Sequence, residues 1–541
     1  NLKVEKESKA YDSAARAPSS TKKLKTFART GRRASRIRGK GYGIPHRPAP
    51  KPGVPGDPIG KDRFSKKFNT EDYDRIYEND FDKVLEKPLS TFSIDVDTAS
   101  YANMRRFLTM NRMPPKDSVR IEEFINYFNS NYPAPKAGSE APFSVNAELA
   151  SCPWAAKHKL LRIGLRGMTF EPKKRPNSNL VFLLDVSGSM NYGPKLPLLK
   201  KAFKLLVNKL GAKDRIAIVV YAGASGVVLE STPASEKKKI LEALDKLRAG
   251  GSTNAGAGIE AAYAIAEKHF IKDGINRVIL ATDGDFNVGT TSRGDLVRLV
   301  EKKAKKNVFL TVLGFGMGNY KDSMLETLSG KGNGNYAYID TINEARKVLV
   351  RQIGGTLITI AKDVKIQIEF NPAKVAAYRL IGYENRMLAA KDFNDDKKDA
   401  GEIGAGHMVT AIYELIPPGV KIPGPSVDAL KYQTPKKLTG AAKSDEIVTV
   451  KLRFKKPKGT KSALVKFPLK DVSGTFNSAS EDMRFASAVA AFAMLLRGSK
   501  YKGNLSYDAV INMAQKAMGA DKYGYRKEFL SLVKKAQSLQ K

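Results

Sequence analysis

Short apolar runs alternate with longer amphipathic stretches between residues 176 and 355. The run from Leu180 to Leu184, which ends at Asp185, is continuously apolar, as expected for a central parallel strand covered on both faces. Further strands are expected at 215–221, 277–282, 308–315 and 336–340, and helices at 196–210, 235–247, 255–269, 293–304, 321–328 and 342–353. Strands that alternate with helices predict an α/β domain with a doubly wound, Rossmann-like sheet.

The segments on either side of this unit show the two-residue alternation of half-buried strands. Before it, strands are expected at 89–96, 143–150 and 159–165; after it, at 364–370, 375–381, 407–415, 447–454 and 462–467. Helical periodicity marks 101–108, 119–128, 482–496, 507–518 and 525–536. Neither flank alone makes a comfortable sandwich, so we predict one β-sandwich formed by both flanks, with the α/β domain inserted into it and a C-terminal helical segment.

The resulting domain organisation has five parts. We place a disordered basic arm at 1–68, an N-terminal flanking region at 69–175, the α/β domain at 176–355, a β-rich C-terminal flanking domain at 356–475 and C-terminal helices at 476–541. The arm has eleven Lys or Arg and no acidic residue between positions 21 and 51, followed by closely spaced prolines. Such a composition buries too little apolar area to offset the entropy of ordering.

Charge adds a second function class. The 541 residues include 93 Lys or Arg and 55 Asp or Glu, a formal net charge of +38. This excess favours anionic partners such as nucleic acid, lipid headgroups or an acidic polymer, with the arm as the point of attachment. A lysine-rich solvated surface explains it equally well, and both interpretations stay open.

Two features narrow the class of protein. The longest apolar run, Phe485 to Leu496, falls short of the ~18 residues that span a bilayer, so it predicts a buried helix and the chain has no expected transmembrane segment. The single cysteine, Cys152, excludes an internal disulfide, a Cys-rich zinc site and a CxxC redox pair.

Oxygen-bearing side chains gather where the predicted strands end. They lie in three separate loops and comprise Asp185, Ser187, Ser189, Thr253 and Asp283. Ligands of open α/β sheets bind at the carboxyl edge of the strands, and hard cations prefer oxygen ligands. The pattern therefore predicts a site for Mg²⁺, or for Mn²⁺ or Ca²⁺. The bland alternative, in which Asp185 caps a helix and the serines form turns, explains only one of the three loops.

The arrangement Asp185-x-Ser187-x-Ser189, with Thr253 and Asp283 later, resembles the metal-ion-dependent adhesion site of von Willebrand factor type A domains. The resemblance implies a non-enzymatic protein. In that family the serines and the threonine reach the metal directly, the aspartates directly or through water, and an Asp or Glu carboxylate of a protein partner fills the open position. In related domains the last helix, here 342–353, shifts with the state of the metal site.

The flanks are similar to a bacterial subfamily, the YfbK-like proteins. The resemblance rests on Pro88 to Tyr101 and 119–128 in the N-terminal flank, and on Leu380 to Arg386 and Asp521 to Arg526 in the C-terminal one. It implies an exported, often lipid-anchored protein of the cell envelope, periplasmic or associated with the outer membrane or surface. Since the chain starts at Asn1 rather than at Met, we expect that an upstream signal or lipid-attachment segment has been removed.

Two enzymatic alternatives remain. Asp95-Val-Asp97-Thr98 follows an apolar strand and matches the DxDxT pattern of metal-dependent phosphatases, with Asp95 as nucleophile and Asp97 as general acid. No βα alternation follows it, however. Hydrolysis by Ser187 or Ser189 lacks the GxSxG context and a histidine that any pattern places nearby.

Overall fold

The computed structural model describes residues 71–540 apart from 137, 171–174, 192–194, 223–224, 252–254, 285–291, 318–319, 425–430, 432–436 and 473. The predicted basic arm therefore lies outside the described residues. So does one predicted metal ligand, Thr253.

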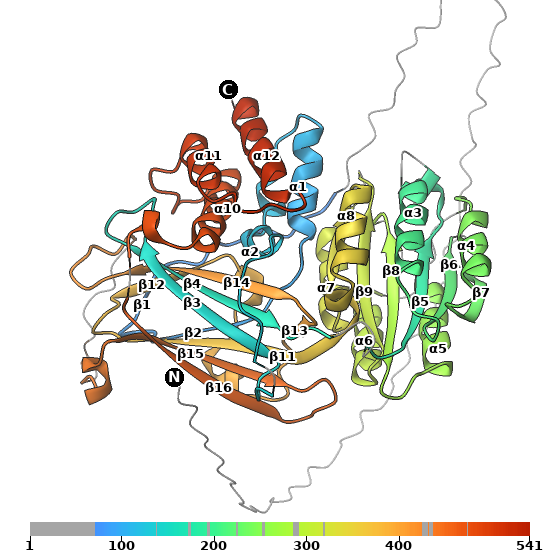
Figure 1. Cartoon of the computed structure of the whole chain (residues 1–541), viewed down its shortest axis with the longest axis horizontal. Helices are drawn as coiled ribbons and strands as arrows, with labels where there is room; N and C mark the ends of the chain where they lie inside the picture. The colour runs from blue at the N-terminus through green and yellow to red at the C-terminus, as the bar shows by residue number, and fades with distance from the viewer. Residues whose placement is uncertain are drawn as a thin grey trace, which may run out of the picture. The chain divides into compact units, whose positions relative to one another are not determined.

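The inserted domain is built on a six-stranded sheet with the order β10-β9-β8-β5-β6-β7 (Figure 1). Its strands are β5 (Ser178–Asp185), β6 (Arg215–Tyr221), β7 (Ser225–Pro233), β8 (Ile275–Thr282), β9 (Phe309–Phe315) and β10 (Tyr336–Ile339). All neighbours are parallel except β6 and β7, which are antiparallel. The predicted doubly wound α/β sheet is confirmed.

Helices cover both faces of this sheet because the side chains of β5 alternate between them. Phe182 belongs to the buried cluster that includes residues of α3 and α4, whereas Val181 belongs to the cluster that includes residues of α5, α6 and α7, and neither is exposed to solvent. The helices are α3 (Lys195–Val207), α4 (Lys237–Lys246), α5 (Ala255–Lys268), α6 (Arg293–Lys305), α7 (Asp322–Lys331), α8 (Ile342–Arg346) and α9 (Ile353–Leu357). Two-sided burial explains why β5 is apolar throughout.

Both flanks contribute strands to two antiparallel sheets. One has the order β1-β12-β14-β4-β3; the other has β13-β11-β15-β16, with β2 also paired to β11. Their bounds are β1 (Asp82–Lys83), β2 (Leu89–Ser93), β3 (Phe143–Ser151), β4 (Lys159–Gly167), β11 (Thr359–Phe370), β12 (Ala377–Ile381), β13 (Gly401–Gly404), β14 (Met408–Ile416), β15 (Glu446–Lys455) and β16 (Ser462–Lys470). The rings of Phe143 and Phe454 meet between the sheets at 4.9 Å. The predicted sandwich of both flanks is confirmed.

A helical layer covers the outer face of the β12-β14-β4 sheet (Figure 1). It contains α1 (Ala99–Thr109), α2 (Ile121–Asn126), α10 (Glu481–Arg497), α11 (Tyr507–Gln515) and α12 (Tyr525–Gln540). Leu160 and Ile412 of the sheet share one buried cluster with Phe492 of α10. The apolar run of α10 is thus a core helix. Within the described residues, none of the helices combines the length and apolar character needed to cross a bilayer.

Some local features differ from the prediction. Strands β1, β7 and β13 were not expected, and the single helix expected at 342–353 is broken: α8 ends at Arg346, a π-helical turn (η4) spans Lys347–Arg351, and α9 begins at Ile353. The short 3-10 helices of the described residues are η1 (Lys116–Ser118), η3 (Gly188–Asn191), η5 (Glu384–Arg386), η6 (Ala390–Asn394), η7 (Gly440–Lys443) and η8 (Phe476–Ser478).

Candidate metal centre

Two fully buried carboxylates lie at the carboxyl edge of the parallel sheet. Asp185 is the last residue of β5, and Asp283 directly follows the last residue of the neighbouring strand β8. Neither side chain is exposed to solvent. Parallel strands end at the same edge, so the fold brings together residues that are far apart in the sequence.

The loop after β5 turns tightly over Asp185. The backbone N–H of Ser187 donates to Asp185 Oδ1 at 2.9 Å, and the hydroxyls of Ser187 and Ser189 lie 3.1 Å apart. The N–H of Gly188 donates to the carbonyl of Gly251 at 3.0 Å, which fixes the approach of the next loop. Thr253 and Asn254 follow in that loop, and Tyr192 follows in the loop after β5. All three lie outside the described residues.

The second oxygen of Asp185 is also held. Tyr221 and Thr282 donate their hydroxyls to Asp185 Oδ2 at 3.2 and 3.1 Å. Burial and the charge of Asp283 raise the pKa of Asp185 to about 6, against the opposing effect of these hydrogen bonds. Two carboxylates share a site from which water is excluded, so the site favours positive charge.

A positive charge is already present, on a residue that sequence reasoning missed. Lys195, the first residue of α3, places Nζ 2.8 Å from Asp283 Oδ2, and 9% of its side chain is exposed. The sequence-based prediction considered only residues that offer oxygen ligands, so it did not include Lys195. A basic residue at the start of the helix that follows the metal loop is the signal that could have found it.

The donors present fit a hard divalent cation. Asp185, Ser187, Ser189 and Asp283 offer only oxygen atoms, which is the ligand set preferred by Mg²⁺ and Ca²⁺. The ammonium of Lys195 pairs with Asp283 and therefore neutralises only one of the two carboxylates.

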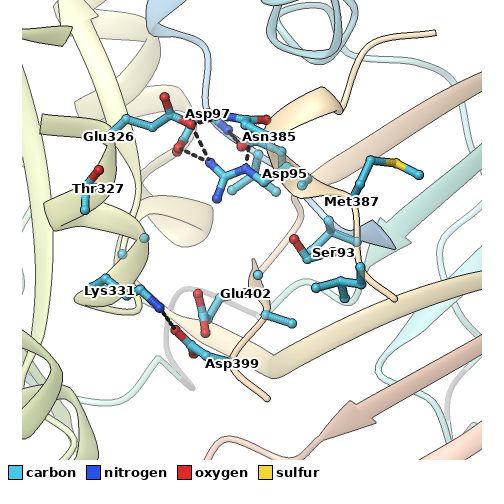
Figure 2. Close-up of a pocket in the computed structure, with 18 of the residues that line it drawn as sticks. Ser93, Asp95, Asp97, Glu326, Thr327, Lys331, Asn385, Met387, Asp399 and Glu402 are labelled. Atoms are coloured by element: carbon cyan, nitrogen blue, oxygen red, sulfur yellow. Dashed lines mark hydrogen bonds and ion pairs between the residues drawn. The ribbon is translucent and has the colours of Figure 1, made fainter. Parts of the chain in front are cut away.

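The phosphatase alternative places Asp95 and Asp97 beside a separate cavity of about 400 Å³ (Figure 2). Asp95 accepts from the backbone N–H of Asp97 at 2.9 Å and from Arg386 Nε at 3.1 Å. Asp97 accepts from the N–H of Tyr336 at 2.7 Å and from Arg386 Nη2 at 3.3 Å. One guanidinium thus binds both carboxylates, an arrangement typical of a structural ion pair rather than of a nucleophile and an acid.

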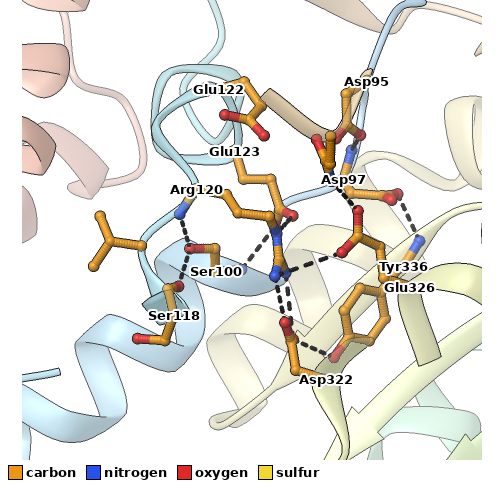
Figure 3. A network of polar contacts seen from close by, with 12 residues as sticks. Asp95, Asp97, Ser100, Ser118, Arg120, Glu122, Glu123, Asp322, Glu326 and Tyr336 are labelled. Atoms are coloured by element: carbon orange, nitrogen blue, oxygen red, sulfur yellow. Dashed lines mark hydrogen bonds and ion pairs between the residues drawn. The ribbon is translucent and has the colours of Figure 1, made fainter. Parts of the chain in front are cut away.

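These carboxylates belong to a network that joins the flanks to the inserted domain (Figure 3). Arg120 of the N-terminal flank pairs with Glu123 of α2 and with Asp322 of α7. Arg386 of the C-terminal flank pairs with Glu326, also on α7, at 3.2 Å. The network therefore fixes α7 between the two flanks, which is a structural role.

The serine alternative gains no support from the described contacts. Ser187 and Ser189 face each other. Two of the three described histidines are engaged in the sandwich: His158 pairs with Glu414 at 2.5 Å, and His407 accepts the N–H of Gly404 at 3.3 Å. Neither of these two contacts places a histidine beside Ser187 or Ser189, where it could act as a base.

Three family profiles match the chain. The von Willebrand factor type A domain matches residues 179–351, a profile described as von Willebrand factor matches 67–162, and the C-terminal region of uncharacterized protein YfbK matches 355–539. Type A domains are commonly metal-dependent adhesion or protein-binding modules.

The chain is also similar to individual proteins. Uncharacterized protein YfbK of Escherichia coli is 47% identical over 472 residues, which is 86% of this chain and 81% of that protein. Inter-alpha-trypsin inhibitor heavy chain H2 of Sus scrofa is 25% identical over 236 residues, 40% of this chain and 24% of its own. A solved von Willebrand factor type A protein from Catenulispora acidiphila covers 75% of this chain and 91% of its own, at 16% identity and a TM-score of 0.40. By sequence, the chain belongs to the bacterial YfbK-like family of von Willebrand factor type A proteins.

Proposed function

We propose that this protein is a non-enzymatic binding protein, an adhesion or assembly scaffold, whose inserted domain uses a divalent cation to bind an acidic protein ligand. Mg²⁺ is the proposed cation, with Mn²⁺ or Ca²⁺ as substitutes. The observation that carries this proposal is the pairing of two fully buried carboxylates with two adjacent hydroxyls at one sheet edge. The proposed ligand set is Asp185, Ser187, Ser189, Thr253 and Asp283.

The protein holds these groups in place before anything binds. Asp185 accepts hydrogen bonds from the Ser187 N–H and from the hydroxyls of Tyr221 and Thr282, so its carboxylate has one fixed orientation. The paired hydroxyls of Ser187 and Ser189 present their lone pairs on the same loop. When bound, the cation supplies an open coordination position that an Asp or Glu carboxylate of the ligand completes.

Calorimetric titration of Mg²⁺ and of Mn²⁺ into the metal-stripped protein tests the cation site. Asp185→Ala should abolish saturable binding. The matched control is Asp245→Ala, because Asp245 lies in the same domain but its side chain is 57% exposed and pairs with Lys204, which is 36% exposed. Saturable binding that survives in Asp185→Ala, or that is absent from the unaltered protein, contradicts the proposal.

The ligand class needs its own experiment. Peptides that carry one Asp or Glu should bind only in the presence of the cation, and their Asn or Gln counterparts should not. A cell-envelope location and attachment of the basic arm to an anionic polymer or surface are further parts of the proposal; fractionation of the native host tests the first of these.

A further inference from the structure

Lys195 is buried and closely packed beside the candidate metal centre. Its Nζ lies 2.8 Å from Asp283 Oδ2, and the residue is 8% exposed. The aliphatic part of the side chain passes over Gly316, where a Cβ atom would overlap it. Gly316 has a φ of +78°, a backbone conformation that strongly favours glycine.

A hydrogen bond fixes the backbone at Gly316. The hydroxyl of Tyr338, a residue of β10, donates to the carbonyl of Gly316. A buried ammonium costs much free energy unless it is paired, and Asp283 is the partner that Lys195 has in this structure. The pair is therefore a built contact between the start of α3 and the end of β8, not a surface ion pair.

We propose that Lys195 is the resident cation of the metal-free site, and that its ammonium leaves Asp283 whenever a divalent cation is bound. This inference rests on the proposed cation site and adds how that site is regulated. An ammonium on Asp283 and a divalent cation on the same carboxylate repel each other across a distance of a few ångströms in a medium of low polarity. Binding is then an exchange of one cation for another, which lowers the affinity of the site for the divalent cation and, in the empty site, offsets the charge of Asp283.

The charge and the shape of Lys195 can be separated by substitution. Lys195→Met keeps the aliphatic stem and removes the ammonium. Lys204→Met is the matched control, because Lys204 lies on the same helix and pairs at 2.6 Å with the exposed residue Asp245. In the full chain, Lys195→Met should bind Mg²⁺ at least about tenfold more tightly than the unaltered protein, whereas Lys204→Met should not differ from it.

Lysine labelling of the unaltered protein is a second test, and it does not depend on whether a substituted protein folds. Amine acetylation followed by mass spectrometry should find Lys195 protected without Mg²⁺ and labelled at saturating Mg²⁺, with Lys204 labelled equally in both. Equal protection of Lys195 in both states overturns the proposal, as does an unchanged or weaker Mg²⁺ affinity in Lys195→Met.

Failure of the underlying site looks different. If the unaltered protein and Lys195→Met both show no saturable Mg²⁺ binding, the proposed cation site is wrong and the exchange falls with it. If the unaltered protein binds, Asp185→Ala does not, and Lys195→Met matches the unaltered protein, the cation site stands and only the exchange is wrong.

Discussion

Arg105 of helix α1 holds Asp340, the residue after strand β10, through two parallel hydrogen bonds: Nε to Oδ2 at 2.7 Å and Nη2 to Oδ1 at 2.6 Å. The same guanidinium reaches Glu344 of α8 at 2.7 Å and Glu528 of α12 at 3.0 Å. One side chain of the N-terminal flank therefore contacts the inserted domain and the C-terminal helices. It does so beside the π-helical turn that interrupts the last helix of the inserted domain.

Removal of this guanidinium should weaken the whole junction. Arg105→Met removes the paired cation of the buried carboxylate of Asp340 and one of the two cations beside Glu344, whose other is Lys347; this should cost about 3–5 kcal/mol of unfolding free energy. Urea unfolding followed by the fluorescence of Trp154, the single tryptophan, measures it. Arg298→Met is the control, since its side chain is 70% exposed and its loss should change stability by less than about 0.5 kcal/mol. Equal stability of the two variants would refute a structural role for Arg105.

Stability should also depend on pH through Glu122. This residue is fully buried, its Oε1 has no hydrogen-bond partner, and burial and the nearby charges of Glu384 and Asp95 raise its pKa to about 7. The folded state therefore binds the proton more tightly than the unfolded chain, whose glutamate titrates near 4.5. The stability contributed by the proton is complete below about pH 4.5 and is lost as the pH rises through about 7.

Glu122→Gln imitates the protonated side chain at every pH. The variant should therefore match the unaltered protein near pH 5 and be more stable than it at pH 8, by about 2 kcal/mol. Thermal unfolding across this range measures the difference. Glu230→Gln, a substitution at an exposed position, should show no such dependence. A difference that stays constant between pH 5 and pH 8 would argue against a buried proton at Glu122.

The phosphatase alternative makes a prediction of its own. Since Arg386 binds both Asp95 and Asp97, Asp95→Asn should weaken the junction without changing turnover of a generic phosphate ester above background. Mg²⁺ binding at the Asp185 site should persist in this variant. Turnover by the unaltered protein that disappears in Asp95→Asn would instead establish the enzymatic function.

The basic arm is tested by deletion. If it attaches the protein to an anionic polymer, removal of residues 1–60 should flatten the dependence of polymer binding on salt concentration, because fewer counterions are released on binding. Heparin chromatography at several salt concentrations measures this slope. A slope that the deletion leaves intact would assign the interaction to the rest of the chain.

The sequence predicted the two sheets and the inserted domain because their signals are local. Continuous apolarity marks β5, where Leu180 and Val181 face opposite helical layers, and alternation marks sandwich strands such as β15. Strand β7 escaped because it is an antiparallel edge strand: Val227 and Val228 are 45% and 39% exposed, and the pairing with β6 shifts register twice. Its burial pattern therefore lacks a regular period.

The candidate site was predictable in part for the same reason. Asp185, Ser187 and Ser189 lie within five positions of the chain, and Asp283 follows a recognisable strand, so their grouping follows from the order of the strands. The position of Lys195 at the start of a helix makes it a candidate, but its pairing with Asp283 also depends on the space above Gly316. Periodicity does not encode that contact.

The hydroxyl of Tyr132 meets that of Thr410 across 278 positions of sequence, beside the pairing of β4 with β14. During synthesis at roughly 5–20 residues per second, one edge of β4 thus waits on the order of tens of seconds for its neighbour to leave the ribosome. The inserted domain pairs strands that are much closer in sequence, so its sheet is complete before the surrounding sandwich closes. The nascent chain must meanwhile keep an unpaired strand edge from joining another chain, so this delay exposes the N-terminal flank to misassembly.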